Sequence, residues 1–340
     1  MTTIDMHTHF FPENWPDLAA RFGTPDWPWI KHVGDGEAMV MVGKREFRKI
    51  SQVCWNVEAR LVEMDRDGVD VQIFCATPVL FAYGRPAEHA LACAQMFNDS
   101  ALELCSRGRG RLYALCQVPL QDVDAASKEL TRCMRAGHLG VQIGNHVGNR
   151  DLDDEGLITF LQHCASEGAA VVVHPWDMME PERMAKYMMG WTVGMPAETQ
   201  LSIVSMILGG AFERLPRDLR LCFTHGGGSF AFLLGRLENA WHRRDVARGK
   251  STQPPSRYLD RFYVDSAVFD GACLRFLLDV MGEDRVMLGS DYPFPLGEDR
   301  PGTLVRTSPG LAPATREKVL SGNAVRFFGL DERLRGATNV

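Results

Sequence analysis

Residues 4–12 read Ile4-Asp5-Met6-His7-Thr8-His9-Phe10-Phe11-Pro12, an apolar stretch that carries His7 and His9. It has the composition of a buried β-strand. Because successive side chains of a strand alternate between its faces, the two histidines share one face, at a spacing suited to two ligands of one metal ion. A His-x-His pair near a chain end can also be an ordinary surface feature. The downstream sequence decides between these interpretations.

The composition is that of an ordinary globular protein. The chain has 340 residues, of which 45% are hydrophobic and 24% charged, enough for one large domain or two smaller ones. A net charge of −6 gives no electrostatic reason to expect nucleic acid or an anionic membrane as partner. We therefore expect the ligand to be a small molecule.

The compartment is expected to be the cytoplasm. The N-terminal residues lack the basic region and apolar run of a secretory signal, and the apolar internal stretch at residues 199–212 is too short to cross a bilayer. The nine cysteines are an odd number, scattered through apolar segments without a Cys-x-x-Cys pair. They are predicted to be reduced core residues and not a disulfide framework.

Apolar runs rich in β-branched residues alternate with segments of helical periodicity along nearly the whole chain. The eight predicted strands are residues 3–9, 70–78, 111–119, 139–145, 170–176, 219–226, 262–269 and 285–292. The predicted helices are residues 57–67, 86–106, 123–136, 153–167, 197–214, 229–244 and 271–281. This series predicts an α/β fold, a TIM-type (β/α)8 barrel, with an open doubly wound sheet as the alternative. Without internal repeats or linkers, residues 1–340 are predicted to form a single domain.

Two segments interrupt the alternation. Residues 13–55 separate the first strand from its helix and contain an alternating pair, 38–42 and 45–50, with Gly43 near the turn. They are predicted to form a small β-rich insertion over the barrel mouth. Residues 177–196 hold a cluster of methionines and aromatics that includes Trp191. Such a cluster is usually core, but this one directly follows a strand that ends in a histidine.

Polar residues gather at the predicted carboxyl ends of the strands, where barrel enzymes place their chemistry. The first strand ends in His7 and His9, the fifth in His174, the sixth in His225 and the eighth in Asp291. Imidazoles with one carboxylate suit Zn²⁺ and related divalent ions. His7, His9, His174 and Asp291 are assigned to the metal.

His225 is then free to act as the proton acceptor for metal-bound water, unless it is a further ligand. No strand ends in the lysine or glutamate that would bridge a second metal, which favours one ion per chain. His146, after the fourth strand, is a weaker candidate.

In their order along the chain, the His7-x-His9 strand, His174, His225 and Asp291 resemble the amidohydrolase superfamily. Longer strings extend the resemblance to a group of decarboxylases in it. These strings are Gly-Val-Asp-Val-Gln, Cys-Ala-Thr-Pro-Val, Gly-His-Leu-Gly-Val-Gln-Ile-Gly-Asn-His, Val-His-Pro-Trp-Asp-Met-Met, Met-Pro-Ala-Glu-Thr-Gln, His-Gly-Gly-Gly-Ser-Phe-Ala-Phe-Leu-Leu-Gly-Arg and Gly-Ser-Asp-Tyr-Pro-Phe-Pro-Leu-Gly.

The resemblance implies a zinc-dependent, non-oxidative decarboxylation without an organic cofactor. The implied substrate is a carboxymuconate semialdehyde, the acyclic product of 3-hydroxyanthranilate ring opening in tryptophan catabolism. In this group the base that matches His225 activates the zinc-bound water. Alternative substrates are another ring-cleavage product or a hydroxybenzoate, and hydrolysis is an alternative reaction. A barrel with purely structural zinc is a third possibility, disfavoured because no cysteine ends a strand.

The resemblance also implies how a dianionic substrate is held. Arg48 in the insertion and Arg236 on the helix after the sixth strand match carboxylate-binding arginines of the group. The second is supplied across the interface of a homodimer. Trp191 matches a mobile aromatic residue at the pocket, and Phe294 is a further expected wall. The insertion is more charged than is usual in the group, which leaves the substitution pattern of the substrate open.

Overall fold

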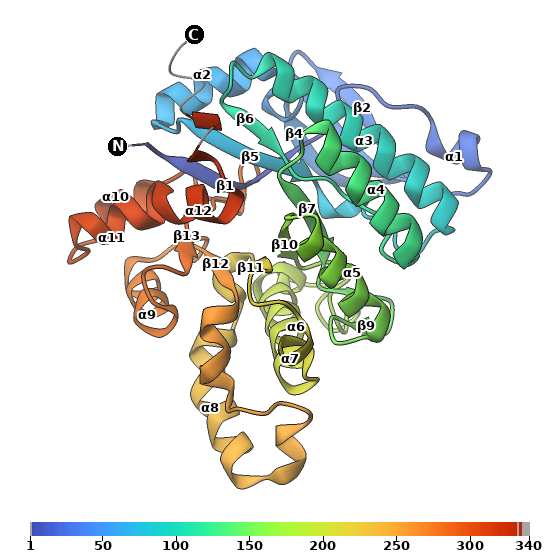
Figure 1. Cartoon of the computed structure of the whole chain (residues 1–340). Helices are drawn as coiled ribbons and strands as arrows, with labels where there is room; N and C mark the ends of the chain where they lie inside the picture. The colour runs from blue at the N-terminus through green and yellow to red at the C-terminus, as the bar shows by residue number, and fades with distance from the viewer. Residues whose placement is uncertain (1, 332, 335–340) are drawn as a thin grey trace.

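Parallel strands form the centre of the molecule, in a computed structural model that describes residues 2–331 and 333–334 (Figure 1). One sheet has the order β1-β5-β6, and its strands are β1 (Ile4–Phe10), β5 (Val71–Ala76) and β6 (Leu112–Ala114). A second has the order β13-β12-β11-β10-β7, with β7 (Gly140–Gly144), β10 (Ala170–His174), β11 (Arg220–Phe223), β12 (Tyr263–Asp265) and β13 (Val286–Met287). All eight coincide with predicted strands.

The two sheets meet at two seams. Isolated parallel bridges join Thr8 to Tyr292 and Cys116 to Val141. At the first seam the His9 N–H donates to the Tyr292 carbonyl oxygen at 2.8 Å. The regular ladders thus leave the barrel unclosed, and a few backbone hydrogen bonds at each seam connect the neighbouring edges. The parallel strands in chain order confirm the predicted α/β barrel class over the open doubly wound sheet.

Helices connect the strands and cover the outside of the sheets (Figure 1). Those between strands are α2 (Val57–Asp67), α3 (Ala87–Arg107), α4 (Val123–Ala136), α5 (Glu155–Ser166), α6 (Met195–Leu208), α7 (Ala211–Arg214), α8 (Phe230–Arg243) and α9 (Gly271–Met281). Three short helices follow β13: α10 (Thr303–Thr307), α11 (Pro313–Glu317) and α12 (Asn323–Phe328). The side chains of Asn56, Asp122 and Asp270 accept hydrogen bonds from the first turns of α2, α4 and α9, which explains why these helices begin where the sequence predicted.

One predicted helix is wrong in its extent. The segment 197–214 is divided into α6 and α7 at Gly209 and Gly210. Gly210 has a φ of 75°, a left-handed conformation that ends the first helix. A Cβ at Gly209 would lie 2.1 Å from Asp153 Oδ2, so the close packing there requires glycine.

The segment 13–55 forms its own antiparallel sheet, β2-β3-β4, together with the short helix α1 (Leu18–Phe22). The predicted pair corresponds to β3 (Glu37–Val42) and β4 (Arg45–Ser51), whereas β2 (Pro28–Gly34) was not predicted because its outer residues are polar. Buried Val40 and Ile50 belong to one apolar cluster with Phe10 at the end of β1. The insertion is therefore packed against the strand that carries His7 and His9.

All nine cysteines are free, and all but Cys105 and Cys273 are buried. The prediction of core residues is therefore confirmed for seven of them and is wrong for Cys105 and Cys273. No helix in the described part of the chain is long and apolar enough to cross a membrane. Of the predicted domain 1–340, residues 1, 332 and 335–340 lie outside the described residues.

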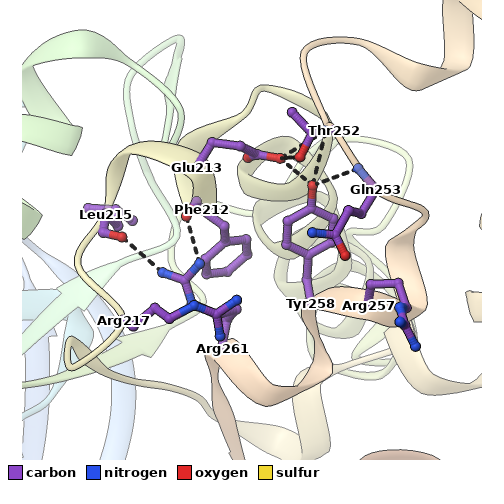
Figure 2. Close-up of a pocket in the computed structure, with 9 residues that line it drawn as sticks. All are labelled: Phe212, Glu213, Leu215, Arg217, Thr252, Gln253, Arg257, Tyr258 and Arg261. Carbon is purple, nitrogen blue, oxygen red and sulfur yellow. Dashed lines mark hydrogen bonds between the residues drawn. The ribbon is translucent and has the colours of Figure 1, made fainter.

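A small polar cleft of about 220 Å³ lies at the amino ends of β11 and β12, away from the strand ends that bear the histidines. Figure 2 shows the residues that line it. Several of its polar groups form hydrogen bonds with their neighbours. Glu213 accepts hydrogen bonds from Tyr258 Oη and from the N–H and Oγ1 of Thr252. Arg261 donates to the carbonyl oxygens of Phe212 and Leu215. These contacts tie the connection after α7 to the segment before β12, which is a structural role.

Candidate metal centre

Four of the residues predicted from the sequence meet at one end of the barrel. His7 and His9 come from β1, His174 is the last residue of β10, and Asp291 follows β13. All four are buried, and their ligand atoms lie within 4.8 Å of one another. Asp291 Oδ1 is 3.0 Å from His9 Nε2 and 3.6 Å from His7 Nε2. Donors from three distant parts of the sequence thus face one small volume.

The donors fit a divalent metal ion. The Nε2 atoms of His7, His9 and His174 are buried and have no hydrogen-bond partner among the described residues. A buried polar nitrogen without a partner is costly, and a metal ion would satisfy all three at once. Three imidazoles and one carboxylate suit Zn²⁺, Mn²⁺ and similar ions.

The opposite ring nitrogens are held by hydrogen bonds. His7 Nδ1 lies 2.7 Å from Asp265 Oδ2, and His174 Nδ1 lies 2.9 Å from the Pro175 carbonyl oxygen. Donation of the Nδ1 proton to these acceptors leaves the Nε2 lone pair directed toward the cluster. Asp265 was missed in the sequence, although it is a carboxylate at the carboxyl end of the seventh strand, a position equivalent to those of the histidines.

The electrostatics differ between the histidines of the cluster: burial lowers the pKa of His174 as well as that of His9, whereas burial of His7 is outweighed by Asp265 and Asp291, which raise its pKa. Burial lowers the pKa of His9 to about 4. Burial opposes ionisation of Asp291, but His225 and His9 outweigh it and hold the pKa of that carboxyl well below its usual range. For His9, His174 and Asp291 these shifts favour the protonation states that metal ligation requires.

His225 lies beside the four donors. Its Nε2 is 3.7 Å from Asp291 Oδ2, and its ring centroid is 5.0 Å from those of His7 and His174. Thr224 Oγ1 contacts its Nδ1 at 3.1 Å. His225 and Asp291 both have left-handed backbone conformations, with φ of 54° and 62°. Such conformations are unfavourable for residues other than glycine and are concentrated at functional sites.

A cavity of about 700 Å³ opens from this cluster. Asp291, His225 and half-buried Trp191 line it near the donors, and its outer wall is apolar, with Phe232 on α8 and Phe276 on α9. Apart from its polar floor the cavity is an open, mostly apolar pocket of the kind in which small molecules bind.

Arg48 and Phe294 lie together on the other side of His9. The Arg48 guanidinium carbon is 3.9 Å from the centroid of the Phe294 ring, which stacks on His9 with centroids 5.2 Å apart and planes 23° apart. Burial lowers the pKa of Arg48, while Asp291 opposes that shift. The insertion therefore places a partly desolvated cation next to the metal-ligand cluster. Phe294 packs against His9 and Arg48. It is not among the residues that line the 700 Å³ cavity.

Two predicted residues lie outside this arrangement. Arg236 is exposed on α8 and makes no hydrogen bond or ion pair with the described residues of its own chain. Its contribution to a neighbouring subunit remains a prediction. His146 faces the carbonyl oxygens of Gly148 and Asp177, and it is not part of the metal-ligand cluster.

The model of the amidohydrolase family matches residues 4–330. The chain belongs to the amidohydrolase family. The relatives of this amidohydrolase include the 2-amino-3-carboxymuconate-6-semialdehyde decarboxylase of Dictyostelium discoideum, 42% identical over 96% of this chain and 92% of the relative. Within the amidohydrolases, the comparison places the chain in the group that bears this name.

Solved structures share the fold. The apo IDCase of Metarhizium anisopliae is 22% identical, with a TM-score of 0.84 over 98% of each chain. A dihydroxybenzoic acid decarboxylase of Polaromonas sp. JS666, solved with bound manganese, is 19% identical, with a TM-score of 0.79 over 98% of this chain and 99% of the other. The comparisons support a metal-dependent decarboxylase of the amidohydrolase superfamily.

Proposed function

We propose that this amidohydrolase is a carboxy-lyase that converts 2-amino-3-carboxymuconate 6-semialdehyde to 2-aminomuconate 6-semialdehyde in tryptophan catabolism, the kynurenine pathway. The observation that carries the proposal is the group of four buried metal donors beside His225 at the base of the cavity, in a chain 42% identical to a relative of that name. The free cysteines support a location in the cytoplasm.

In this proposal His7, His9, His174 and Asp291 hold one divalent ion per subunit, Zn²⁺, and no organic cofactor takes part. When bound, the ion supplies Lewis acidity, which lowers the pKa of water and offsets negative charge. The bond from Asp265 keeps His7 in the tautomer that presents Nε2.

His225 is the proposed general base. Its Nε2 is buried without a hydrogen-bond partner among the described residues and faces Asp291, so it is placed to take a proton from water that adds to the conjugated substrate. His225 returns that proton to the carbon that bears the departing carboxylate. Loss of CO₂ then breaks one C–C bond, whose electron pair re-forms the conjugated double bond as the added hydroxyl leaves the neighbouring carbon as hydroxide, so the added water leaves its proton on carbon and the carboxylate is replaced by hydrogen.

Arg48 is the proposed contact for one substrate carboxylate, since a half-buried guanidinium beside Phe294 is already partly desolvated. Trp191 forms a wall of the pocket, and Phe294 fixes Arg48. The outer wall of the cavity is apolar, so a dianion requires a second cation from elsewhere. We assign this role to Arg236 of a second subunit in a homodimer.

The test is turnover by the metal-loaded protein with two substrates in parallel. Freshly generated 2-amino-3-carboxymuconate 6-semialdehyde should lose its absorbance with release of one CO₂ per molecule, whereas 2,6-dihydroxybenzoate should be inert. The opposite preference would overturn the proposal in favour of a hydroxybenzoate decarboxylase, the alternative substrate class.

A further inference from the structure

The connection between β10 and α6 has little to hold it in place. Much of residues 177–193 is exposed, including Tyr187 and Met188, which are 86% and 51% accessible. Asp177, Glu180, Tyr187 and Met188 all have left-handed backbone conformations although none is glycine. The connection nevertheless carries Trp191, which lines the cavity beside His225.

Glu198, in the first turn of α6, binds the two ends of this connection together. The side chain is 4% exposed, and its Oε1 accepts a hydrogen bond from the Met179 N–H at 2.6 Å. Its Oε2 accepts one from Asn145 Nδ2 at 2.9 Å. Asn145 Oδ1 in turn accepts from the Trp176 N–H at 2.7 Å. The base of the connection is thus fastened to α6 and to the end of β7 by one carboxylate.

Two neighbouring contacts belong to the same arrangement. His146 Nε2 is 3.0 Å from the Asp177 carbonyl oxygen and 4.0 Å from Glu198 Oε2. Gly194 lies against the beginning of the connection, where an added Cβ would be 3.0 Å from Met178 Cβ. The two ends therefore touch through the Met178 side chain on Gly194 as well as through the carboxylate.

We infer that Glu198, with Asn145, is a positioning residue that sets the place of Trp191 at the cavity by closing the base of the connection 177–194. The effect on substrate rests on the proposed function, because Trp191 is assigned there to the pocket wall. The closure of the base does not depend on which substrate is bound.

The hydrogen-bond directions allow a sharp exchange experiment. In Glu198→Gln the new amide N–H₂ faces either the Asn145 N–H₂ or the Met179 N–H, so one donor is left without an acceptor. In Asn145→Asp two carboxylates face each other. In the double variant Asn145→Asp/Glu198→Gln the new amide at position 198 donates to the new carboxylate at position 145 and accepts from the Met179 N–H. That carboxylate also accepts from the Trp176 N–H, so every bond is restored and the negative charge has moved from one partner to the other.

Limited digestion with trypsin measures, without substrate, how firmly the two ends of the connection are held together. Arg183 and Lys186 are exposed within the connection, and cleavage there reports how often it opens. We expect each single variant to be cut about tenfold faster at these two sites, in line with the loss of one hydrogen bond to a charged group, and the double variant to return to the wild-type rate. Glu182→Gln, the same substitution at an exposed position of the same segment, is the matched control and should be cut at the wild-type rate.

Kinetics then separate the two proposals. The single variants should raise KM about tenfold with less change in kcat and retain metal, and the double variant should recover the wild-type KM. Equal tryptic rates in all variants, or single-variant rates that the double variant does not reverse, would overturn the inference whatever the activity. Failure of wild-type turnover with the tryptic pattern as expected would overturn the proposed substrate and leave the closure of the base standing. If a single variant does not fold, the double variant still tests the inference, because it should fold and be cut at the wild-type rate.

Discussion

Replacement of Asp265 by asparagine tests how the metal donors are oriented. One carboxylate oxygen accepts from His7 Nδ1 at 2.7 Å, and the other accepts from the N–H groups of Gly226 at 2.8 Å and Ala267 at 3.1 Å. An amide has one acceptor oxygen and cannot satisfy both sides. In Asp265→Asn, either the amide N–H₂ faces the His7 Nδ1–H or it faces the two backbone N–H groups.

The cost follows from that conflict. If the proton of His7 moves from Nδ1 to Nε2, the clash with the amide is relieved, but the Nε2 lone pair that would bind the metal is lost. If the proton stays on Nδ1, a buried N–H group remains without an acceptor. A partner of this kind contributes about 10- to 100-fold to metal affinity, which corresponds to about 1.4–2.7 kcal/mol. We expect the dissociation constant for Zn²⁺ or Mn²⁺ to rise by this factor.

Titration of metal-free protein against a chelating indicator measures the change. Asp279→Asn, the same substitution at an exposed position on α9, is the control and should bind metal as the wild type does. At saturating metal the Asp265→Asn protein should recover most of its activity. Metal affinity within about threefold of wild type would refute the reasoning that Asp265 fixes the His7 tautomer.

Three further outcomes follow. His225→Ala should retain one metal ion per chain and lose at least about 100-fold in kcat, as removal of a general base typically does; loss of metal would instead make His225 a ligand. Mixing His225→Ala with Arg236→Ala subunits should restore part of the activity if sites are shared, and no recovery after verified subunit exchange would contradict that. Burial opposes ionisation of Glu129, but its bonds from Arg132 and Asn98 outweigh it and lower its pKa below 4.5. The wild type should therefore have a larger free energy of unfolding than Glu129→Gln, with the full difference present above about pH 4.5 and a smaller one as the pH falls through the folded-state pKa of Glu129. Urea unfolding measures both values, and a difference independent of pH would contradict the assignment.

The strands and most helices were predictable because a local sequence pattern indicates each of them. Helix α4 begins after Asp122 and ends at Gly137, a capping residue and a left-handed glycine that the sequence displays directly. Strand β2 was not predictable, because its pairing with β3 comes from the hairpin geometry of the insertion and its own residues, such as Lys31 and His32, do not alternate in polarity. The break at Gly210 depends on contacts that only the folded chain makes.

The residues of the site also divide into those that the sequence predicts and those that only the folded chain reveals. His7, His9, His174 and Asp291 could be found because parallel strands bring their carboxyl ends together, so position on the strand is enough. The contacts of Glu198 were not predictable, since they join a helix to a backbone N–H and a side-chain amide that lie 19 and 53 residues away. A buried glutamate in a helix gives no sign in the sequence of which donors it meets.

The proposed function requires that the four donors hold one catalytic metal ion. The most direct measurement is CO₂ release from 2-amino-3-carboxymuconate 6-semialdehyde by chelator-stripped protein titrated with Zn²⁺ or Mn²⁺. We expect no turnover without metal and a linear recovery that ends at one ion per chain. Full turnover by stripped protein, or a recovery that ends only at two ions per chain, would contradict it.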